Sequence, residues 1–384
     1  MAGKKASAKT TVLTVPELQS CAWLLVEWFR VHARVLPWRE GVYDPYKILV
    51  SEFMLQQTQM GTVIPYFERW MARWPDLSSL AAADEAEALK LWEGLGYYSR
   101  CRNLLKAARA MVKAGYDCPP ASVEELRAFP GIGDYTAGAI ASIGHDLPVP
   151  AVDGNVERVI SRLLGMEEPS GSTALRRRVK DSVSLMLKNP GGSFGERVSP
   201  REFNQALMDL GAMICTPSRG GVPFCGECPW EKSCLAHETG REAKLPLLRQ
   251  RPAILQEDAW GFLAVSPNER LLLHRRPNKG LWASMWEIPW FLRKGDFWED
   301  FDAWRLSCGL VLQLDKDSLR EVGSTSFSFT THHVRAWVVV CTVKDMPMRE
   351  EWGFFQFNDI DNLSLPAPSR KFLACLKGKN KILV

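Results

Sequence analysis

Apolar residues recur every three or four positions along most of the first 240 residues. This spacing predicts amphipathic helices, and the clearest segments are residues 16–32, 84–95, 99–115, 172–189 and 200–215. Proline and glycine separate these segments, and no stretch alternates apolar and polar residues over a useful length. The first part of the chain is therefore predicted to be all-α.

The pattern changes after a polar, proline-containing connection. Short runs rich in β-branched and aromatic residues predict strands at residues 259–265, 270–276 and 334–343, and helical spacing returns at residues 295–310 and 369–378. The second part is therefore predicted to be α+β. A chain of 384 residues is long enough for two cores. We expect a disordered leader (1–15), a helical domain (16–240), a linker (241–257) and an α+β domain (258–384).

Composition narrows the class of protein. With 46% hydrophobic and 24% charged residues, the chain is typical of a soluble globular protein. No apolar run reaches the roughly 18 residues needed to span a bilayer, so no membrane partner is expected. The basic leader lacks the apolar block of a secretory signal. We expect a reducing compartment: the cytoplasm of a bacterium, or the nucleus or mitochondrion of a eukaryote. The net charge of +4 does not by itself indicate nucleic acid.

After Asp44, residues 45–60 contain a single acid, Glu52, within an almost continuous apolar run. Asp44 followed by Pro45 is typical of a helix start, and apolar residues cover most of the circumference of that helix, which predicts burial. An unpaired buried acid holds its proton near neutral pH. The alternative is a structural glutamate, paired with an arginine or capping a neighbouring helix.

Four of the ten cysteines lie close together, at Cys215, Cys225, Cys228 and Cys234. Such crowding in a reducing compartment indicates a metal centre rather than disulfides. Four thiolates at this spacing hold zinc or an iron–sulfur cluster, and spacing alone favours zinc.

A glycine-rich turn, Pro130-Gly131-Ile132-Gly133, separates two predicted helices. The glycines allow a tight turn and leave backbone N–H groups exposed at a helix start, where a phosphate can bind. The sequence from residue 126 to residue 143 has the helix-hairpin-helix pattern. A turn with no ligand is the alternative.

Asp153 precedes Gly154 and Asn155 at the start of another predicted helix. An N-cap is the usual role of aspartate there. If Glu52 lies nearby, however, the two carboxyl groups form the pair that cleaves glycosidic bonds. Tyr97 and Tyr98 follow a flexible turn, where a ring could either wedge between bases or pack in the core.

Together these motifs resemble those of the MutY-type adenine DNA glycosylases, in the helix-hairpin-helix superfamily. The similarity is carried by LPWR (36–39), SEFMLQQTQ (51–59), VIPYFERWMARWP (63–75), GLGYYSR (94–100), PGIGDYTAGAI (130–140), VDGNVERV (152–159), FNQALMDLGAMIC (203–215) and the cysteine set. The resemblance implies a monomer that removes adenine opposite 8-oxoguanine or guanine in double-stranded DNA. It also implies a 4Fe-4S cluster in place of zinc.

The resemblance assigns roles residue by residue. Glu52 would be the acid that protonates the flipped adenine, and Asp153 would stabilise the oxocarbenium-like sugar, with Asn155 and Tyr135 positioning that centre. Tyr135 stands where bifunctional relatives have lysine, which implies base removal without efficient strand cleavage. The further implied contacts are Leu36, Trp38 and Arg39 in the base pocket, Gly131 and Gly133 at a phosphate, and Gln57 and Tyr97 beside the 8-oxoguanine.

The second part resembles the family's Nudix-like domain, through RRPNKGLWASMWEIP (275–289) and FSFTTHHVRAWVV (327–339). No run of magnesium-binding acids follows Glu287, so the resemblance implies a reader of 8-oxoguanine, with Phe329 and Thr330 against the lesion. The chain departs from the family pattern in three places: the spacing from Cys215 to Cys225 is longer, Ser284 replaces glycine, and Thr330 and Thr331 replace serine and histidine.

Three other functions are compatible with parts of the sequence. A bifunctional pyrimidine-lesion glycosylase would share the helical motifs, but Tyr135 argues against it. A non-catalytic DNA-binding or redox-sensing protein would keep the cysteine cluster without using Glu52. Nucleotide hydrolysis by the second domain would need the magnesium-binding acids that the sequence lacks.

Overall fold

The computed structural model describes residues 13–188, 198–217, 223–248, 253–345 and 350–377. The chain divides into two compact units, one of Met1–Ala82 with Asn103–Gln250 and the other of Ala83–Arg102 with Arg251–Val384. Residues 1–12 of the predicted leader, and the glycines between Cys215 and Cys225, lie outside the described residues. The domain limits drawn from the sequence stay a prediction.

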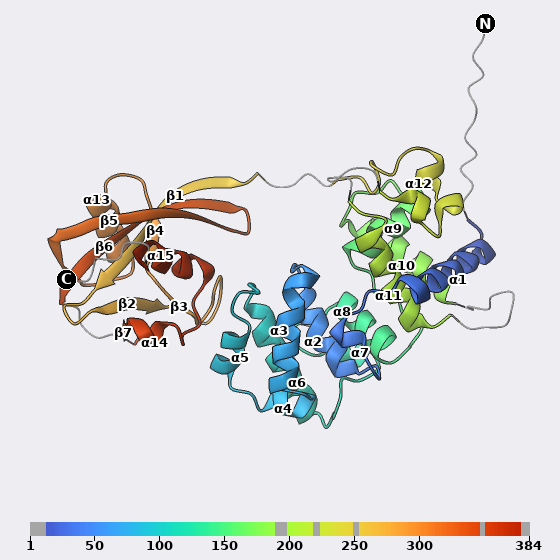
Figure 1. Cartoon of the computed structure of the whole chain (residues 1–384), viewed down its shortest axis with the longest axis horizontal. Helices are drawn as coiled ribbons and strands as arrows, with labels where there is room; N and C mark the ends of the chain where they lie inside the picture. The colour runs from blue at the N-terminus through green and yellow to red at the C-terminus, as the bar shows by residue number, and fades with distance from the viewer. Residues whose placement is uncertain (1–12, 189–197, 218–222, 249–252, 346–349, 378–384) are drawn as a thin grey trace, which may run out of the picture. The chain divides into compact units, whose positions relative to one another are not determined.

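Helices make up the first unit (Figure 1). They are α1 (Val15–His32), α2 (Pro45–Leu55), α3 (Met60–Arg73), α4 (Leu77–Ala81), α7 (Val123–Arg127), α8 (Asp134–Ala139), α9 (Gly154–Leu163), α10 (Thr173–Leu187), α11 (Pro200–Met213) and α12 (Leu235–Glu238), with short turns η1 (Pro37–Arg39), η4 (Cys225–Glu227) and η5 (Glu231–Ser233). Helix α5 (Glu85–Leu91) belongs to the second unit, and α6 (Ser99–Lys113) starts there and ends in the first. Within its described residues, the first unit has only one isolated β-bridge, between Pro169 and Leu247. The all-α prediction is confirmed.

Polar residues fix where the important helices begin. Asp44 caps α2 by accepting a hydrogen bond from the Tyr46 backbone N–H at 2.8 Å, with Pro45 in the first turn. Ser172 caps α10 in the same way. These side chains satisfy backbone donors that have no partner inside the helix, so the helix starts expected from the sequence are the observed ones.

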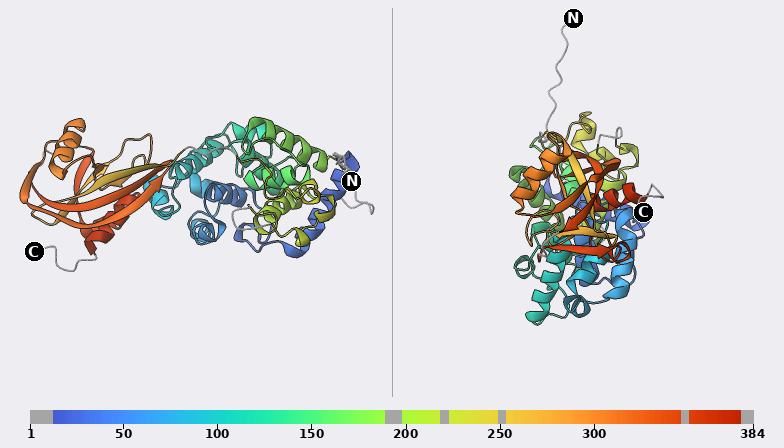
Figure 2. Two further views of the ribbon diagram at one scale, coloured as in Figure 1. Left: turned by 90° about the horizontal axis from the view of Figure 1, so that it is seen from above. Right: turned by 90° about the vertical axis from the view of Figure 1, so that its left-hand side faces the viewer.

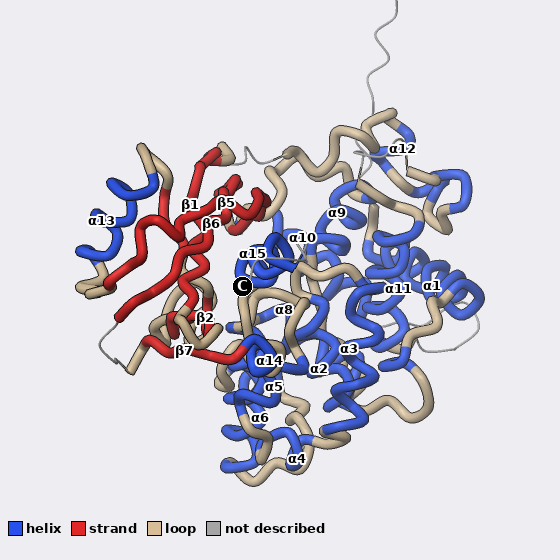
Figure 3. Tube along the Cα trace, turned by 60° about the vertical axis from the view of Figure 1, so that its left-hand side comes forward, coloured by secondary structure: helices blue, strands red, loops and turns tan. Residues whose placement is uncertain are grey.

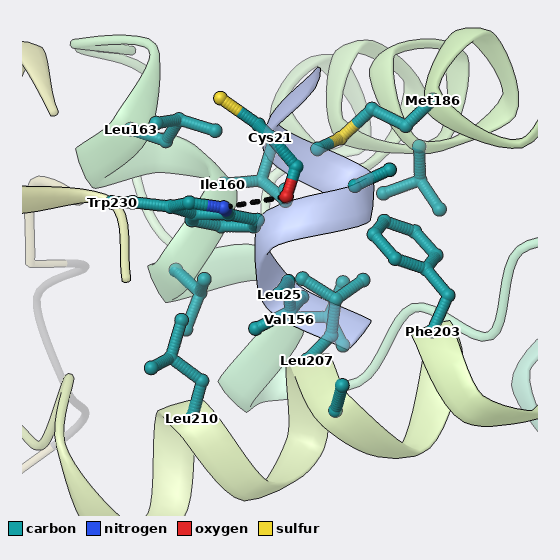
Figure 4. Close-up of a cluster of buried hydrophobic side chains, with 14 of the residues drawn as sticks. Cys21, Leu25, Val156, Ile160, Leu163, Met186, Phe203, Leu207, Leu210 and Trp230 are labelled. Atoms are coloured by element: carbon teal, nitrogen blue, oxygen red, sulfur yellow. Dashed lines mark hydrogen bonds between the residues drawn. The ribbon is translucent and has the colours of Figure 1, made fainter. Parts of the chain in front are cut away.

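The core of the first unit lies between α1, α9, α10 and α11. Leu25, Ile160 and Phe203 are fully buried in it (Figure 4). Trp230, from the loop that carries the cysteines, also packs into this core, and its indole N–H donates to the Cys21 carbonyl oxygen at 2.8 Å. The cysteine loop is thereby anchored to the helical bundle.

Close backbone contacts bring α8 against its neighbours. Helix α8 continues into a π-helical turn, η2 (Ile140–Gly144). A Cβ atom added at Gly138 would lie 2.4 Å from the Pro150 carbonyl oxygen, and one at Gly144 would lie 3.0 Å from the Pro45 Cα. Only glycine permits such contacts. This packing sets α8 beside both the start of α2 and the segment that leads into α9.

A mixed seven-stranded sheet forms the second unit, where strands appear red in Figure 3. Its strands are β1 (Leu255–Val265), β2 (Arg270–Arg275), β3 (Trp286–Glu287), β4 (Trp290–Leu292), β5 (Gln313–Phe329), β6 (His332–Asp345) and β7 (Trp352–Gln356). The order is β3-β2-β1-β6-β5, with β4 beside β1 and β7 beside β2. Strands β1 and β6 run parallel, whereas the other pairs are antiparallel.

Helices α13 (Phe297–Ser307) and α15 (Ala367–Lys377) pack on this sheet, while α14 (Phe357–Ile360) follows β7 (Figures 1 and 2). Leu263 of β1 belongs to the core with Phe372 of α15, and its neighbour Phe262 belongs to the core with Phe301 of α13. Because successive side chains of a strand point to opposite faces, the two helices cover opposite faces. The α+β prediction is confirmed. No described helix has the length and apolar character needed to cross a membrane.

Candidate active site

A cavity of about 1050 Å³ opens in the first unit, between α2, α8, α9 and the turn η1. It collects most of the predicted site residues from segments far apart in the sequence. Those that line it are Leu36, Trp38, Arg39, Glu52, Gln57, Gly133, Tyr135, Asp153 and Asn155. The nearness of Glu52 to Asp153, which the glycosidic-bond interpretation required, is therefore present in the structure.

Glu52 is a buried acid in the wall of this cavity, with 5% of its surface exposed. The pKa of its carboxyl group is raised to about 7, because burial and the Asp153 charge together outweigh the Tyr135 hydroxyl and Arg39, which lower it. Its Oε2 atom has no hydrogen-bond partner among the described residues. A substantial fraction of Glu52 is thus protonated at neutral pH, and one of its oxygens is buried without a described hydrogen-bond partner.

Asp153 has a different environment in the same cavity. It caps α9, and its Oδ1 accepts from the Val156 backbone N–H at 2.7 Å. Its Oδ2 accepts from the Asn155 side-chain amide at 3.0 Å. The pKa of Asp153 is raised by burial, although these hydrogen bonds favour the ionised form and oppose the increase. Asp153 is therefore better suited than Glu52 to carry a negative charge.

Tyr135 lies on α8 between the two acids and the helix α11. Burial and the charges of Glu52 and Asp153 hold the pKa of its hydroxyl well above the usual range. The hydroxyl contacts the Met208 sulfur at 3.9 Å. Tyr135 is thus a neutral hydrogen-bonding group, and it cannot act as an amine nucleophile.

A buried ion-pair network supports the cavity, and sequence reasoning missed it. Asp209 of α11 is fully buried and accepts hydrogen bonds from Arg39 Nη1 at 2.7 Å and from Arg34 Nε at 2.8 Å. Burial raises the pKa of Asp209, but these bonds and charges outweigh burial and leave it lowered. The only sequence signal was Asp209 itself, an acid among the apolar residues of the motif FNQALMDLG (203–211). The network fixes Arg39 beside Glu52.

Two residues that the sequence analysis placed in contact with DNA, Gly131 and Tyr97, do not line this cavity. Gly131 has φ +78° and does not line the cavity; a Cβ atom there would lie 2.6 Å from Asn103 Cβ, so packing also requires the glycine. Tyr97 belongs to the second unit, where it is 55% exposed and has φ +47°. Gln57, at the cavity, also has positive φ. Such backbone conformations are unusual for side-chain-bearing residues and cluster at functional sites.

The four cysteines Cys215, Cys225, Cys228 and Cys234 surround one region of the loop. Burial raises the pKa of Cys228 to about 12, and the charges of the other three thiols raise it further, so all four sulfurs act on one another. Within the described residues, the one group of three potential ligands closer than 4.8 Å is Cys225, His237 and Glu242. No three of the four cysteine sulfurs lie within 4.8 Å of one another.

Family comparisons agree with this architecture. Residues 50–184 match the HhH-GPD superfamily of base excision DNA repair proteins, and residues 260–375 match the NUDIX domain. The chain belongs to the HhH-GPD superfamily. It is 36% identical over 315 residues to the adenine DNA glycosylase of Rattus norvegicus, covering 69% of this chain and 59% of that protein.

Other adenine DNA glycosylases are also similar. The Mus musculus protein is 42% identical over 60% of this chain and 44% of its own length. The Buchnera aphidicola (Schizaphis graminum) protein is 28% identical over 92% of this chain and 98% of its own length. The chain thus spans about half the length of the two mammalian relatives. The resemblance predicted from the motifs is confirmed.

The NUDIX-matching unit of this HhH-GPD protein presents an aromatic cluster at the β5–β6 hairpin. The Phe329 ring stacks on His332 at 4.9 Å and contacts Trp282 at 5.5 Å. Trp282, Ser284 and Thr330 have φ between +46° and +57°, so Ser284 adopts the left-handed conformation that glycine would favour. Arg276 Nη1 donates to both carboxylate oxygens of Glu287, each at 2.9 Å.

The raised pKa of Glu52 predicts how the stability of the folded protein depends on pH. The folded-state pKa of Glu52, about 7, exceeds the ordinary value of 4.5. Its favourable contribution to the free energy of unfolding is therefore complete below about pH 4.5 and is lost as pH rises through about 7. Between about pH 5 and pH 8.5, the wild type should lose about 2–3 kcal/mol of unfolding free energy relative to Glu52→Gln. Urea unfolding followed by tryptophan fluorescence measures this difference.

Glu40→Gln is the matched control for that experiment, because Glu40 is exposed and lies beside Arg39. Its stability should follow the wild type at both pH values. A Glu52→Gln curve parallel to the wild type would contradict the buried, protonated acid.

Proposed function

We propose that the protein is a monofunctional DNA glycosylase that removes adenine from double-stranded DNA where it is paired with 8-oxoguanine or guanine. The observation that carries this proposal is the buried Glu52 carboxyl group, whose Oε2 has no described partner, in one cavity with Asp153. Two acids in unequal environments are suited to cleaving a glycosidic bond. The names of the similar proteins support adenine as the base.

The proposed reaction starts with adenine flipped out of the helix, at a cost of a few kcal/mol. Glu52 donates its proton to a ring nitrogen, and the electron pair of the N-glycosidic bond leaves with the base. Asp153, whose ionised form is favoured by hydrogen bonds from Val156 and Asn155, stabilises the positive charge that develops on the sugar. Water then adds to the sugar carbon, and its proton returns to Glu52.

Strand cleavage is not part of this proposal. A lyase needs an amine that attacks the sugar, and the position of that amine in bifunctional relatives is occupied by Tyr135. Lys180 is the one lysine among the described residues that line the cavity, and it is exposed on α10. The expected product is an intact strand with an abasic site.

We further propose a 4Fe-4S cluster on Cys215, Cys225, Cys228 and Cys234. Support comes from Cys215, Cys228 and Cys234, which pack against the same core as Trp230, and from the family resemblance, which implies this cluster. The cluster would supply a covalent crosslink that orders this loop. Trp230 packs into the core, and Arg162 donates to the Cys215 sulfur at 3.2 Å; both hold the loop in place.

The Nudix-like unit is proposed to read 8-oxoguanine. Phe329 offers a ring for stacking, Thr330 offers a hydroxyl beside it, and both stand on a hairpin stiffened by the aromatic cluster. Phe329 and Thr330 would recognise the base opposite adenine.

The catalytic assignment predicts the behaviour of Glu52→Gln. Single-turnover release of adenine from a duplex with one adenine opposite 8-oxoguanine should fall by about 10²- to 10⁴-fold, with binding to the same duplex retained. In the wild type, the rate should fall as pH rises through about 7 because the working form of Glu52 is protonated. Glu40→Gln is the control. Undiminished adenine release by Glu52→Gln would refute the proposed acid.

The cluster assignment predicts a brown protein that absorbs near ~400 nm and contains roughly four irons per chain. Cys228→Ser should lose most of the iron and colour and unfold at a lower temperature. Cys118→Ser, at an exposed cysteine outside the loop, should match the wild type. A colourless preparation holding one zinc per chain would refute the assignment.

The reader assignment predicts that Phe329→Ala loses discrimination between lesions. The preference for adenine opposite 8-oxoguanine over adenine opposite guanine should fall on the order of tenfold, because stacking on an aromatic ring contributes about 1–3 kcal/mol per base. Leu306→Ala, at an exposed apolar residue of α13, is the control. An unchanged ratio of the two single-turnover rates would contradict the assignment.

A further inference from the structure

Helix α10 places two basic residues at the cavity that contains Glu52 and Asp153. Arg176 and Lys180 are exposed, and both line the cavity. Residues four apart in a helix lie on the same face, about 5–6 Å apart at their Cβ atoms. The two cationic groups therefore form a pair at the rim, while the proposed catalytic acid lies buried within.

A buried acid holds one member of this pair in place. Arg176 Nε lies 3.7 Å from Glu157 Oε2, and the Arg176 side chain is 68% exposed whereas that of Glu157 is 5% exposed. The other oxygen of Glu157 accepts from the Ser170 hydroxyl at 2.9 Å and the Gly171 backbone N–H at 2.6 Å. Glu157 is therefore fixed, and the guanidinium that it attracts faces solvent at the rim.

Gly171 lies within ordinary contact distance of the Arg176 guanidinium. It has φ +73°, and a Cβ atom there would lie 3.8 Å from Arg176 Nη2. Gly171 and Ser170 themselves line the cavity. Lys180 has no ion-pair partner among the described residues. Arg176 thus pairs with one buried carboxylate, and Lys180 adds a second exposed cation at the rim.

The geometry points to a phosphate-binding pair: we propose that Arg176 and Lys180 bind backbone phosphates of the DNA strand whose nucleotide enters the cavity. Guanidinium offers the fork that suits two phosphate oxygens, and lysine adds a second point charge. Phosphate contacts set the register of a nucleic acid on a protein. This pair would hold the sugar at a fixed position relative to Asp153. The inference rests on the proposed glycosylase function.

Neighbouring arginines on α10 do not share this position. Arg177 and Arg178 are also exposed, but neither lines the cavity. Arg178 pairs with Glu168 on the loop before the helix. The pair is therefore distinguished by its position at the cavity and not by the basic character of the whole helix.

Salt dependence of DNA binding tests the phosphate contacts. The probe is a duplex with a tetrahydrofuran abasic-site analogue opposite 8-oxoguanine, which cannot be cleaved. For Arg176→Ala/Lys180→Ala, the slope of log K against log [NaCl] should become shallower by about 1.8, because each lost phosphate contact removes about 0.9. Affinity at low salt should fall as well. A slope equal to that of the wild type would overturn the proposal.

Two further variants make this result specific. Lys106→Ala/Lys113→Ala removes two exposed lysines of α6 that do not line the cavity, and should leave the slope at the wild-type value. Lys180→Ala alone breaks no described ion pair, so it tests the contact even if loss of Arg176 disturbs Glu157. For Lys180→Ala, the slope of log K against log [NaCl] should become shallower by about 0.9. An unchanged slope would remove Lys180 from the site.

A rate measurement tests positioning separately. At saturating protein, single-turnover adenine release by Arg176→Ala should fall about tenfold, with Arg176→Lys recovering part of the loss. If the rate at saturating protein were unchanged while the salt slope became shallower, the claim that Arg176 positions the sugar would be overturned. The claim that the pair binds phosphate would stand. If the wild type released no adenine, the proposed function would fail, but the salt slopes would still decide whether the pair binds phosphate.

Discussion

Glu52 and Asp153 are two carboxyl groups in one buried cavity, and two negative charges there repel each other. The structure resolves this repulsion by unequal hydrogen bonding. Asp153 accepts bonds from Val156 and Asn155, whereas Glu52 leaves Oε2 without a described partner. The proton shared by such a coupled pair therefore resides mainly on Glu52. A proton donor and a negative charge are thereby available in the same cavity.

The rest of the helical unit holds this pair in position. Arg158 of α9 donates to Asn155 Oδ1 at 2.9 Å, to the Gly211 carbonyl oxygen at 2.7 Å and to the Cys215 carbonyl oxygen at 2.8 Å. One guanidinium thus joins the amide that supports Asp153, the end of α11 and the first cysteine of the loop. Disorder in the cysteine loop would reach the active site through this single side chain.

Sequence reasoning recovered what local chemistry determines. The apolar circumference around Glu52 predicted its burial, and the cap at Asp44 predicted the start of its helix. It missed β5, because Gln313–Phe329 is rich in charged and polar residues and has three register shifts against β6, so it lacks a clear period-two pattern. It also missed Asp209, whose partner Arg39 is 170 positions away. Contacts across such separations leave no local pattern.

The placement of positive charge shows why the acid stays neutral. A bare cation beside Glu52 would lower its pKa and remove the proton that the proposed reaction needs. Arg39 is close enough to have this effect, but its guanidinium is bonded to Asp209, whose charge offsets it. Arg176 and Lys180 lie exposed at the rim, where water and salt screen their fields. The cavity can therefore attract a polyanion at its mouth and still keep a protonated carboxyl group inside.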